Sequence, residues 1–127
     1  MDSESRAAAG LLEALSRASE IFAELHHPFA RSRPFSYYVP PSGARIGTVF
    51  TLPDGREVSF TVSISTSADA WHVEGEASVE DEVLIELPRK STPDVRAGLA
   101  VLDAYVGEVA APSIRLLDGL LDGITGL

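Results

Sequence analysis

The sequence predicts an α+β domain with an N-terminal helix, a four-stranded antiparallel meander sheet, and one or two C-terminal helices packed on one face of the sheet. Apolar residues recur every three or four positions near both ends of the chain, and they alternate with polar residues between positions 46 and 87. The connections between the alternating segments are short, so neighbouring strands must be antiparallel. A chain of 127 residues has the usual length of one domain, so we expect a single domain over residues 1–127.

The first helix is expected over residues 3–25. Its apolar side chains fall on one helical face: Leu11, Leu15, Ala18, Phe22 and Leu25. Ser3 or Ser5 can cap its start, and Pro28 prevents its continuation because proline lacks the backbone N–H.

Residues 26–45 contain four prolines, which are Pro28, Pro34, Pro40 and Pro41. We expect a long connection here, with a short extended piece at residues 35–39. A connection of this length is uncommon without a function or a strand inside it. The sequence therefore leaves open whether this segment is a loop or an extra strand.

The four strands are predicted from period-two alternation. Ile46, Phe50 and Leu52 share one side of the first, and the turn Pro53-Asp54-Gly55 leads to the second. The second strand turns Val58, Phe60, Val62 and Ile64 to the core, and the third turns Trp71, Val73, Gly75, Ala77 and Val79 to it. The fourth covers residues 82–87 and is expected to end at Pro88.

A second helix is expected to start with Thr92 as its cap, Pro93 at its first position and Asp94 in its first turn. Pro112 should break or restart it. The tail that follows has a broad apolar stripe of Leu116, Leu117, Leu120, Leu121 and Ile124. This stripe could pack on its own sheet or on a second subunit, which would make residues 113–127 a homo-oligomer contact.

Composition narrows the function classes. The net charge of −9 disfavours binding to nucleic acid or to an anionic membrane, and favours a basic protein partner. Without cysteine there is no disulfide or thiolate chemistry. No secretory signal and no apolar run of about 20 residues is visible, so we expect a cytoplasmic protein. Lys90 is the sole lysine, and Asn and Gln are absent, which we interpret as the codon bias of a GC-rich bacterial genome.

The first candidate partner-binding group lies within residues 26–45, which carry three arginines and no acid. We call this stretch the aromatic-arginine segment. Arginine and aromatic side chains dominate protein-binding hot spots. The alternative is that the aromatic rings cover the edge of the sheet while the arginines are solvated. Its candidate residues are Phe29, Arg31, Arg33, Phe35, Tyr37 and Tyr38.

The second candidate group lies within residues 69–86, which carry seven acids and no base. We call this stretch the acidic hairpin, and its candidates are Glu74, Glu76, Glu80, Asp81 and Glu82. His72, Glu74 and Glu76 share a strand face, but alternate residues are about 6.5 Å apart, so one strand cannot close around a metal ion. The sequence therefore predicts no metal site, and the surface is either a solvated face or a docking surface for a basic partner.

No residue pattern names a reaction or a cofactor. His26 and His27 stand at a helix end, where they are expected to meet its last carbonyl groups. No Ser-His-Asp or glycine-rich phosphate-binding signature is present. We therefore expect a small non-enzymatic module, similar in kind to chaperones, adaptors or immunity proteins, that docks a protein. The alternative is a small-molecule pocket or an enzyme, with Trp71, Phe60 and Tyr38 as walls between sheet and helix.

Overall fold

The computed structural model describes residues 3–39, 43–67, 69–80 and 82–125. The elements follow one another along the chain as α1 (Ser3–Glu24), β1 (Arg31–Val39), β2 (Gly43–Thr51), β3 (Glu57–Ser67), β4 (Ala70–Val79), β5 (Glu82–Thr92), α2 (Val95–Ala110) and α3 (Ser113–Thr125). The strands form one antiparallel sheet in the order β1-β2-β3-β4-β5. The predicted α+β class, the N-terminal helix, the antiparallel sheet and the C-terminal helices are confirmed.

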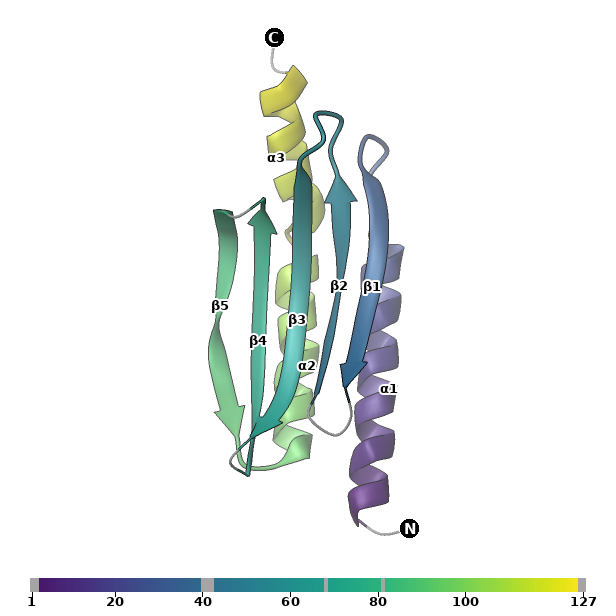
Figure 1. Cartoon of the computed structure of the whole chain (residues 1–127), viewed down its shortest axis with the longest axis vertical. Helices are drawn as coiled ribbons and strands as arrows, with labels where there is room; N and C mark the ends of the chain where they lie inside the picture. Colours follow the sequence, from purple (N-terminus) through teal and green to yellow (C-terminus); the bar gives the residue numbers. More distant parts are fainter. Residues whose placement is uncertain (1–2, 40–42, 68, 81, 126–127) are drawn as a thin grey trace.

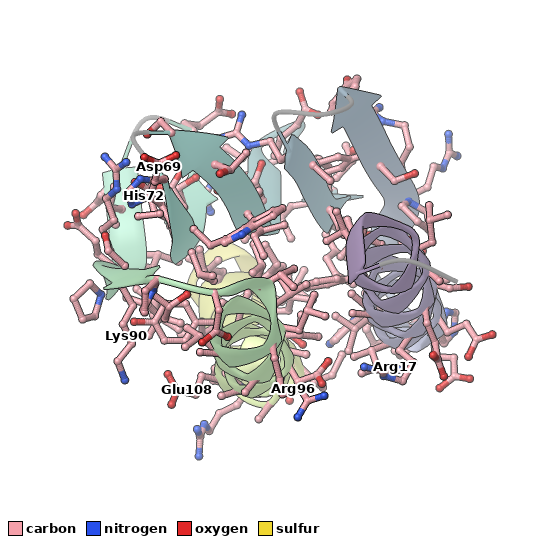
Figure 2. All side chains as sticks on the ribbon, turned by 90° about the horizontal axis from the view of Figure 1, so that it is seen from below. Arg17, Asp69, His72, Lys90, Arg96 and Glu108 are labelled. Carbon is pink, nitrogen blue, oxygen red and sulfur yellow. The ribbon has the colours of Figure 1, made fainter. Side chains whose placement is uncertain are left out.

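The three helices lie on the same face of the sheet. Figure 1 shows α1 behind β1, and α2 continued by α3 behind the middle strands. The view along the strands in Figure 2 shows all three helices on one side, with Arg17, Arg96 and Glu108 on that side of the protein. No helix of the described chain covers the other face.

The core fills the space between the sheet and the helices. Every second residue of β3 is buried from Val58 to Ile64, as the alternation predicts. The rings of Phe50 and Phe60 meet edge to face at 5.8 Å. α1 and α2 bury against these strands the apolar side chains that repeat with helical period: Leu11, Leu15, Ala18, Phe22, Leu102, Val106 and Val109.

The prediction of four strands is wrong, because the sheet has five. The missing strand is β1, inside the segment expected to be a long connection. It pairs with β2 along its whole length, from Arg31 opposite Thr51 to Val39 opposite Gly43. β1 tolerates Pro34 because it is an edge strand, where a missing N–H need not interrupt pairing.

The last strand does not end at Pro88, as the sequence predicted, but continues to Thr92. β5 is the other edge of the sheet, so the proline is again tolerated. The register with β4 shifts between Val73 and Gly75, close to the proline. The buried Tyr105 of α2 donates its hydroxyl hydrogen to the carbonyl of Pro88, which ties this strand to the helix layer.

The cap of α2 is Asp94 and not Thr92. The Asp94 backbone is extended, and its carboxylate accepts a hydrogen bond of 2.8 Å from the N–H of Ala97. Thr92 is the last residue of β5, and its hydroxyl donates to the Asp94 carbonyl. Pro93 therefore precedes the cap instead of opening the helix.

α2 and α3 are separated at Pro112, where the Ser113 hydroxyl donates to the Ala110 carbonyl at 2.7 Å. In α3, Leu117 and Leu121 are buried in the core, and Leu116 and Leu120 are partly buried against it. Part of the apolar stripe thus packs on its own chain. The side chain of Ile124 lies outside the described part, and a second subunit on residues 113–127 stays a prediction.

The helical segment Val95–Gly123 contains α2 and most of α3, and by length and composition it is apolar enough to cross a membrane. The mean hydropathy of its most apolar 18-residue stretch is 1.2. Within the protein 39% of that stretch is buried. This is weak evidence for a span, because the core helices of soluble proteins satisfy the same criterion.

His27 fixes α3 to the connection that follows α1. The side chain is only 5% exposed, and its Nε2 lies 2.7 Å from Oδ1 of Asp118. Its Nδ1 accepts the backbone N–H of Phe29 at 3.1 Å. Because Nδ1 is an acceptor, the ring proton is on Nε2 and is donated to Asp118. His27 therefore bonds to α3, and not to the last carbonyls of α1 as we expected.

We predict that Thr48→Val raises the free energy of unfolding by about 1 kcal/mol. Thr48 is fully buried, and its hydroxyl has no hydrogen-bond partner in the described part of the chain. Valine has nearly the same shape and removes this unpaired polar atom. Urea denaturation measures the change, and Thr51→Val, at a half-buried position, serves as control. A destabilised Thr48→Val protein would contradict the assignment of this hydroxyl as unpaired.

We predict that Asp118→Ala lowers the free energy of unfolding by about 1 kcal/mol, because it removes the acceptor for the buried imidazole of His27. The exposure of Asp118 keeps the loss small. Asp122→Ala, one turn further along α3, is the matched control and should leave stability unchanged. Equal effects of the two substitutions in thermal denaturation would show that the contact with His27 contributes nothing.

Candidate functional site

The face of the sheet opposite the helices is the candidate site, and we call it the open face. Its positions alternate with core positions: Ile46 and Phe50 of β2 point to the helices, so Arg45, Gly47 and Val49 point away. The register places three β1 residues beside them, with Arg33 opposite Val49, Phe35 opposite Gly47 and Tyr37 opposite Arg45.

The other strands add hydroxyl and carboxyl groups to this face. In β3 the residues between the buried apolar positions are Ser59, Thr61 and Ser63. Ser63 is opposite Glu74, and Thr61 is opposite Glu76, in β4. Glu76 is in turn opposite Glu86 in β5. Parts of the aromatic-arginine segment and of the acidic hairpin therefore share one face, separated by β3.

Two adjoining hollows mark the middle of the open face. The first has a volume of about 200 Å³ and lies between β3, β4 and β5, next to Glu74, Glu76, Glu86 and Arg89. The second, of about 300 Å³, lies toward β1, next to Arg33, Phe35, Tyr37 and Val49. Arg45, Thr61 and Glu76 line both.

The β1–β2 half of the face presents aromatic rings and arginines. The rings of Phe35 and Tyr37 lie 5.7 Å apart, and the Tyr37 side chain is 63% exposed. Gly47 leaves room for Phe35, because a carbon added at position 47 would lie 3.0 Å from that ring. Arg33 is paired with Glu57 at 3.2 Å. Arg45 forms no ion pair with any described residue.

The β4–β5 half of the face is acidic. Nε of Arg89 lies 3.6 Å from the Glu74 carboxylate. Glu76 and Glu86 have no such partner among the described residues, although they stand directly opposite each other in neighbouring strands. Like charges in that position repel. This half therefore holds two carboxylates whose charge the described chain does not compensate.

Several predicted site residues lie away from these hollows. Phe29 is in the connection between α1 and β1, with its ring 6.1 Å from that of His27. Arg31 begins β1, and Glu82 begins β5. Glu80 has a turn conformation with φ of 53°, and its carboxylate accepts the N–H of Glu57 at 3.3 Å. Asp81 and the side chain of Tyr38 are outside the described residues.

Ten residues of the two hollows were absent from the predicted site, and these are Arg45, Val49, Ser59, Thr61, Ser63, Gly75, Ser78, Glu86, Leu87 and Arg89. The signal for Thr61 and Ser63 was present in the sequence, since both alternate with the core residues of β3. Their position became meaningful only when the register placed them between charged strands.

The remaining polar clusters have structural explanations. His72 contacts Ser91 of β5 at 2.7 Å and Ser67 of β3 at 3.0 Å, and no described acid contacts its ring. Figure 2 shows His72 away from the helices. Hydrogen bonding from the backbone N–H of Arg56 lowers the pKa of Asp54, in the turn between β2 and β3. Among the described residues no group of three or more His, Cys, Asp or Glu side chains could hold a metal ion.

A scan against protein-family models and searches of curated proteins and of solved structures found no match to this chain.

Proposed function

We propose that this protein is a small, non-enzymatic protein-binding module that docks a partner protein on the open face of its sheet. The observation that carries the proposal is the arrangement of that face: exposed Tyr37 beside Phe35 and Arg45 in one half, and uncompensated Glu76 and Glu86 in the other. Aromatic and arginine side chains are the groups that contribute most to protein interfaces.

The charge pattern of the open face specifies which charges a partner protein must carry to fit it. A partner places acidic or hydrogen-bond-accepting groups over Arg33 and Arg45, and basic groups over Glu76 and Glu86. The net charge of −9 attracts partners with a basic surface and speeds their encounter. Chaperones, adaptors and immunity proteins are classes in which such a module serves.

The face is a better docking surface than the sheet edges. Each edge strand contains a proline, Pro34 in β1 and Pro88 in β5, which removes a donor that an added strand would need. The register of β5 is also irregular. Strand addition at an edge is therefore disfavoured.

Two of the residues expected to wall the alternative pocket, Phe60 and Trp71, do not line the hollow of about 130 Å³ that lies between α1, β1 and β2. Phe60 is fully buried in the core. Beside Trp71 the layers are closely packed, because a carbon added at Gly98 would lie 3.2 Å from Cβ of Trp71 and 3.3 Å from Oγ1 of Thr92. Phe60 is thus part of the filled core, and the half-buried Trp71 packs against it.

We predict that a photo-crosslinking phenylalanine analogue at position 37 captures one protein species in the cells that make this protein. The same analogue at Arg96 or Glu108, on the helix side, should not capture it. The captured protein is identified by mass spectrometry, purified and titrated with the full chain. Tyr37→Ala should then weaken binding about tenfold, as expected for the loss of a hot-spot aromatic.

Ile114→Ala is the matched control, because Ile114 is an exposed apolar residue on α3 and should not affect affinity. Capture from the helix side and from position 37 alike would contradict docking on the open face. So would the absence of any captured species.

A further inference from the structure

We propose that the smaller hollow of the open face is a pocket for one basic side chain, lysine or arginine, of the docked partner. This inference rests on the proposed function and names the chemistry that its central contact recognises. The pocket lies between β3, β4 and β5, and Thr61, Glu76 and Glu86 are the groups that would hold the cation.

Thr61 is the first observation that points to a ligand. It is 8% exposed although it belongs to the open face, since it forms the floor shared by both hollows. Its hydroxyl has no hydrogen-bond partner among the described residues. Thr48, and not Thr61, has the buried hydroxyl without a partner in the described part of the chain, so the Thr61 oxygen reaches the solvent of the hollow, and a donor entering the hollow would replace that solvent as its partner.

The pair Glu76 and Glu86 is the second observation. The two residues are directly opposite each other across β4 and β5, and both line the hollow. Neither carboxylate forms an ion pair with a described residue, although Arg45 and Arg89 line the same hollow. An ammonium or guanidinium group between them would convert the repulsion into two charge-assisted hydrogen bonds.

The two arginines at the rim do not supply that cation. Arg89 is occupied with Glu74 at 3.6 Å. Arg45 is in β2, and its register partner Ser63 separates it from Glu74, so its backbone is roughly 10 Å from β4 at about 4.8 Å per strand. Once Arg89 and Glu74 are paired, Glu76, Glu86 and Arg45 remain around the hollow, so the carboxylates are still in excess and the β4–β5 end, where Arg45 forms no ion pair with a described residue, is anionic.

The size of the hollow suits one side-chain end. Its volume of about 200 Å³ is on the order of six or seven water molecules at ~30 Å³ each. The hollow is open to solvent, so a long flexible side chain can enter from a docked surface. Its aliphatic stem would leave toward the Phe35 and Tyr37 rings, which line the adjoining hollow.

The test is a nuclear magnetic resonance titration of the full chain with capped single amino acids as probes. Nα-acetyl-lysine methylamide and Nα-acetyl-arginine methylamide are compared with the norleucine derivative, which has a similar stem but no charge, and with the glutamate derivative. At least one basic probe should give saturable shifts at the amides of Thr61, Glu76 and Glu86. The norleucine and glutamate probes should give none.

Two variants separate a pocket from general attraction to an acidic protein. The double substitution Glu76→Gln and Glu86→Gln should weaken binding of the basic probe at least tenfold, and Thr61→Val should weaken it measurably. The double substitution Glu20→Gln and Glu108→Gln, on α1 and α2, removes the same charge from the helix side, and as the charge-matched control it should have no effect.

Saturable shifts that are equal for the lysine and norleucine probes, no saturable shifts at all, or unchanged affinity in the Glu76/Glu86 variant would overturn the inference. A failure of the basic pocket can be told apart from a failure of the proposed docking function. If the probes fail while crosslinking from position 37 succeeds, the open face docks its partner without a basic anchor. If the probes bind and no partner is captured, the docking proposal fails.

Discussion

The burial of one face of the sheet is the constraint on which the rest of the structure depends. Strands β2, β3 and β4 alternate so regularly that, Val49 apart, their large apolar side chains point to one side. α1, α2 and α3 each have an apolar stripe, and only this side offers them a partner. The helices therefore share one face, and the other face is left to polar and aromatic residues.

The meander then decides how the charges of the open face are distributed. Sequential strands are neighbours, so the arginines of β1 and β2 stay at one edge while the acids of β4 and β5 stay at the other. β3 lies between them with short hydroxyl side chains. Arg45 and Glu74 lie in the same row of the sheet, but β3 lies between their strands. Their backbones are therefore not neighbours. The charges are therefore available to a partner.

Periodicity in the sequence was enough to predict the fold class and the core positions of β3 and β4, and Pro112 predicted the break between α2 and α3. The prediction of strands failed where proline was given too much weight. Pro34 and Pro88 indicated non-strand segments, yet both lie in edge strands, and no local signal shows which strand is at the edge. The cap of α2 was misplaced by two residues because Thr92 and Asp94 are both good caps.

The candidate site was predictable in part. Composition indicated the aromatic-arginine segment and the acidic hairpin, but it could not show that they meet on one face, since that depends on the pairing of β1 that the prediction lacked. Glu80 is an exposed acid, as the sequence suggested, and its carboxylate also accepts a hydrogen bond from the N–H of Glu57 at the start of β3. The alternation of β3 indicated that Thr61 faces away from the core, but its place between charged strands follows only from the pairing of β3 with β2 and β4.

Hydroxyl-radical footprinting of the protein inside its cells and after purification tests the central claim most directly, because it needs no knowledge of the partner. Docking on the open face predicts that Phe35 and Tyr37 are oxidised less in the cell than in the purified protein. Ile21 and Ile114, exposed on α1 and α3, should be oxidised equally in both. Equal oxidation of Phe35 and Tyr37 in the two settings, or protection of α1 alone, would contradict the account.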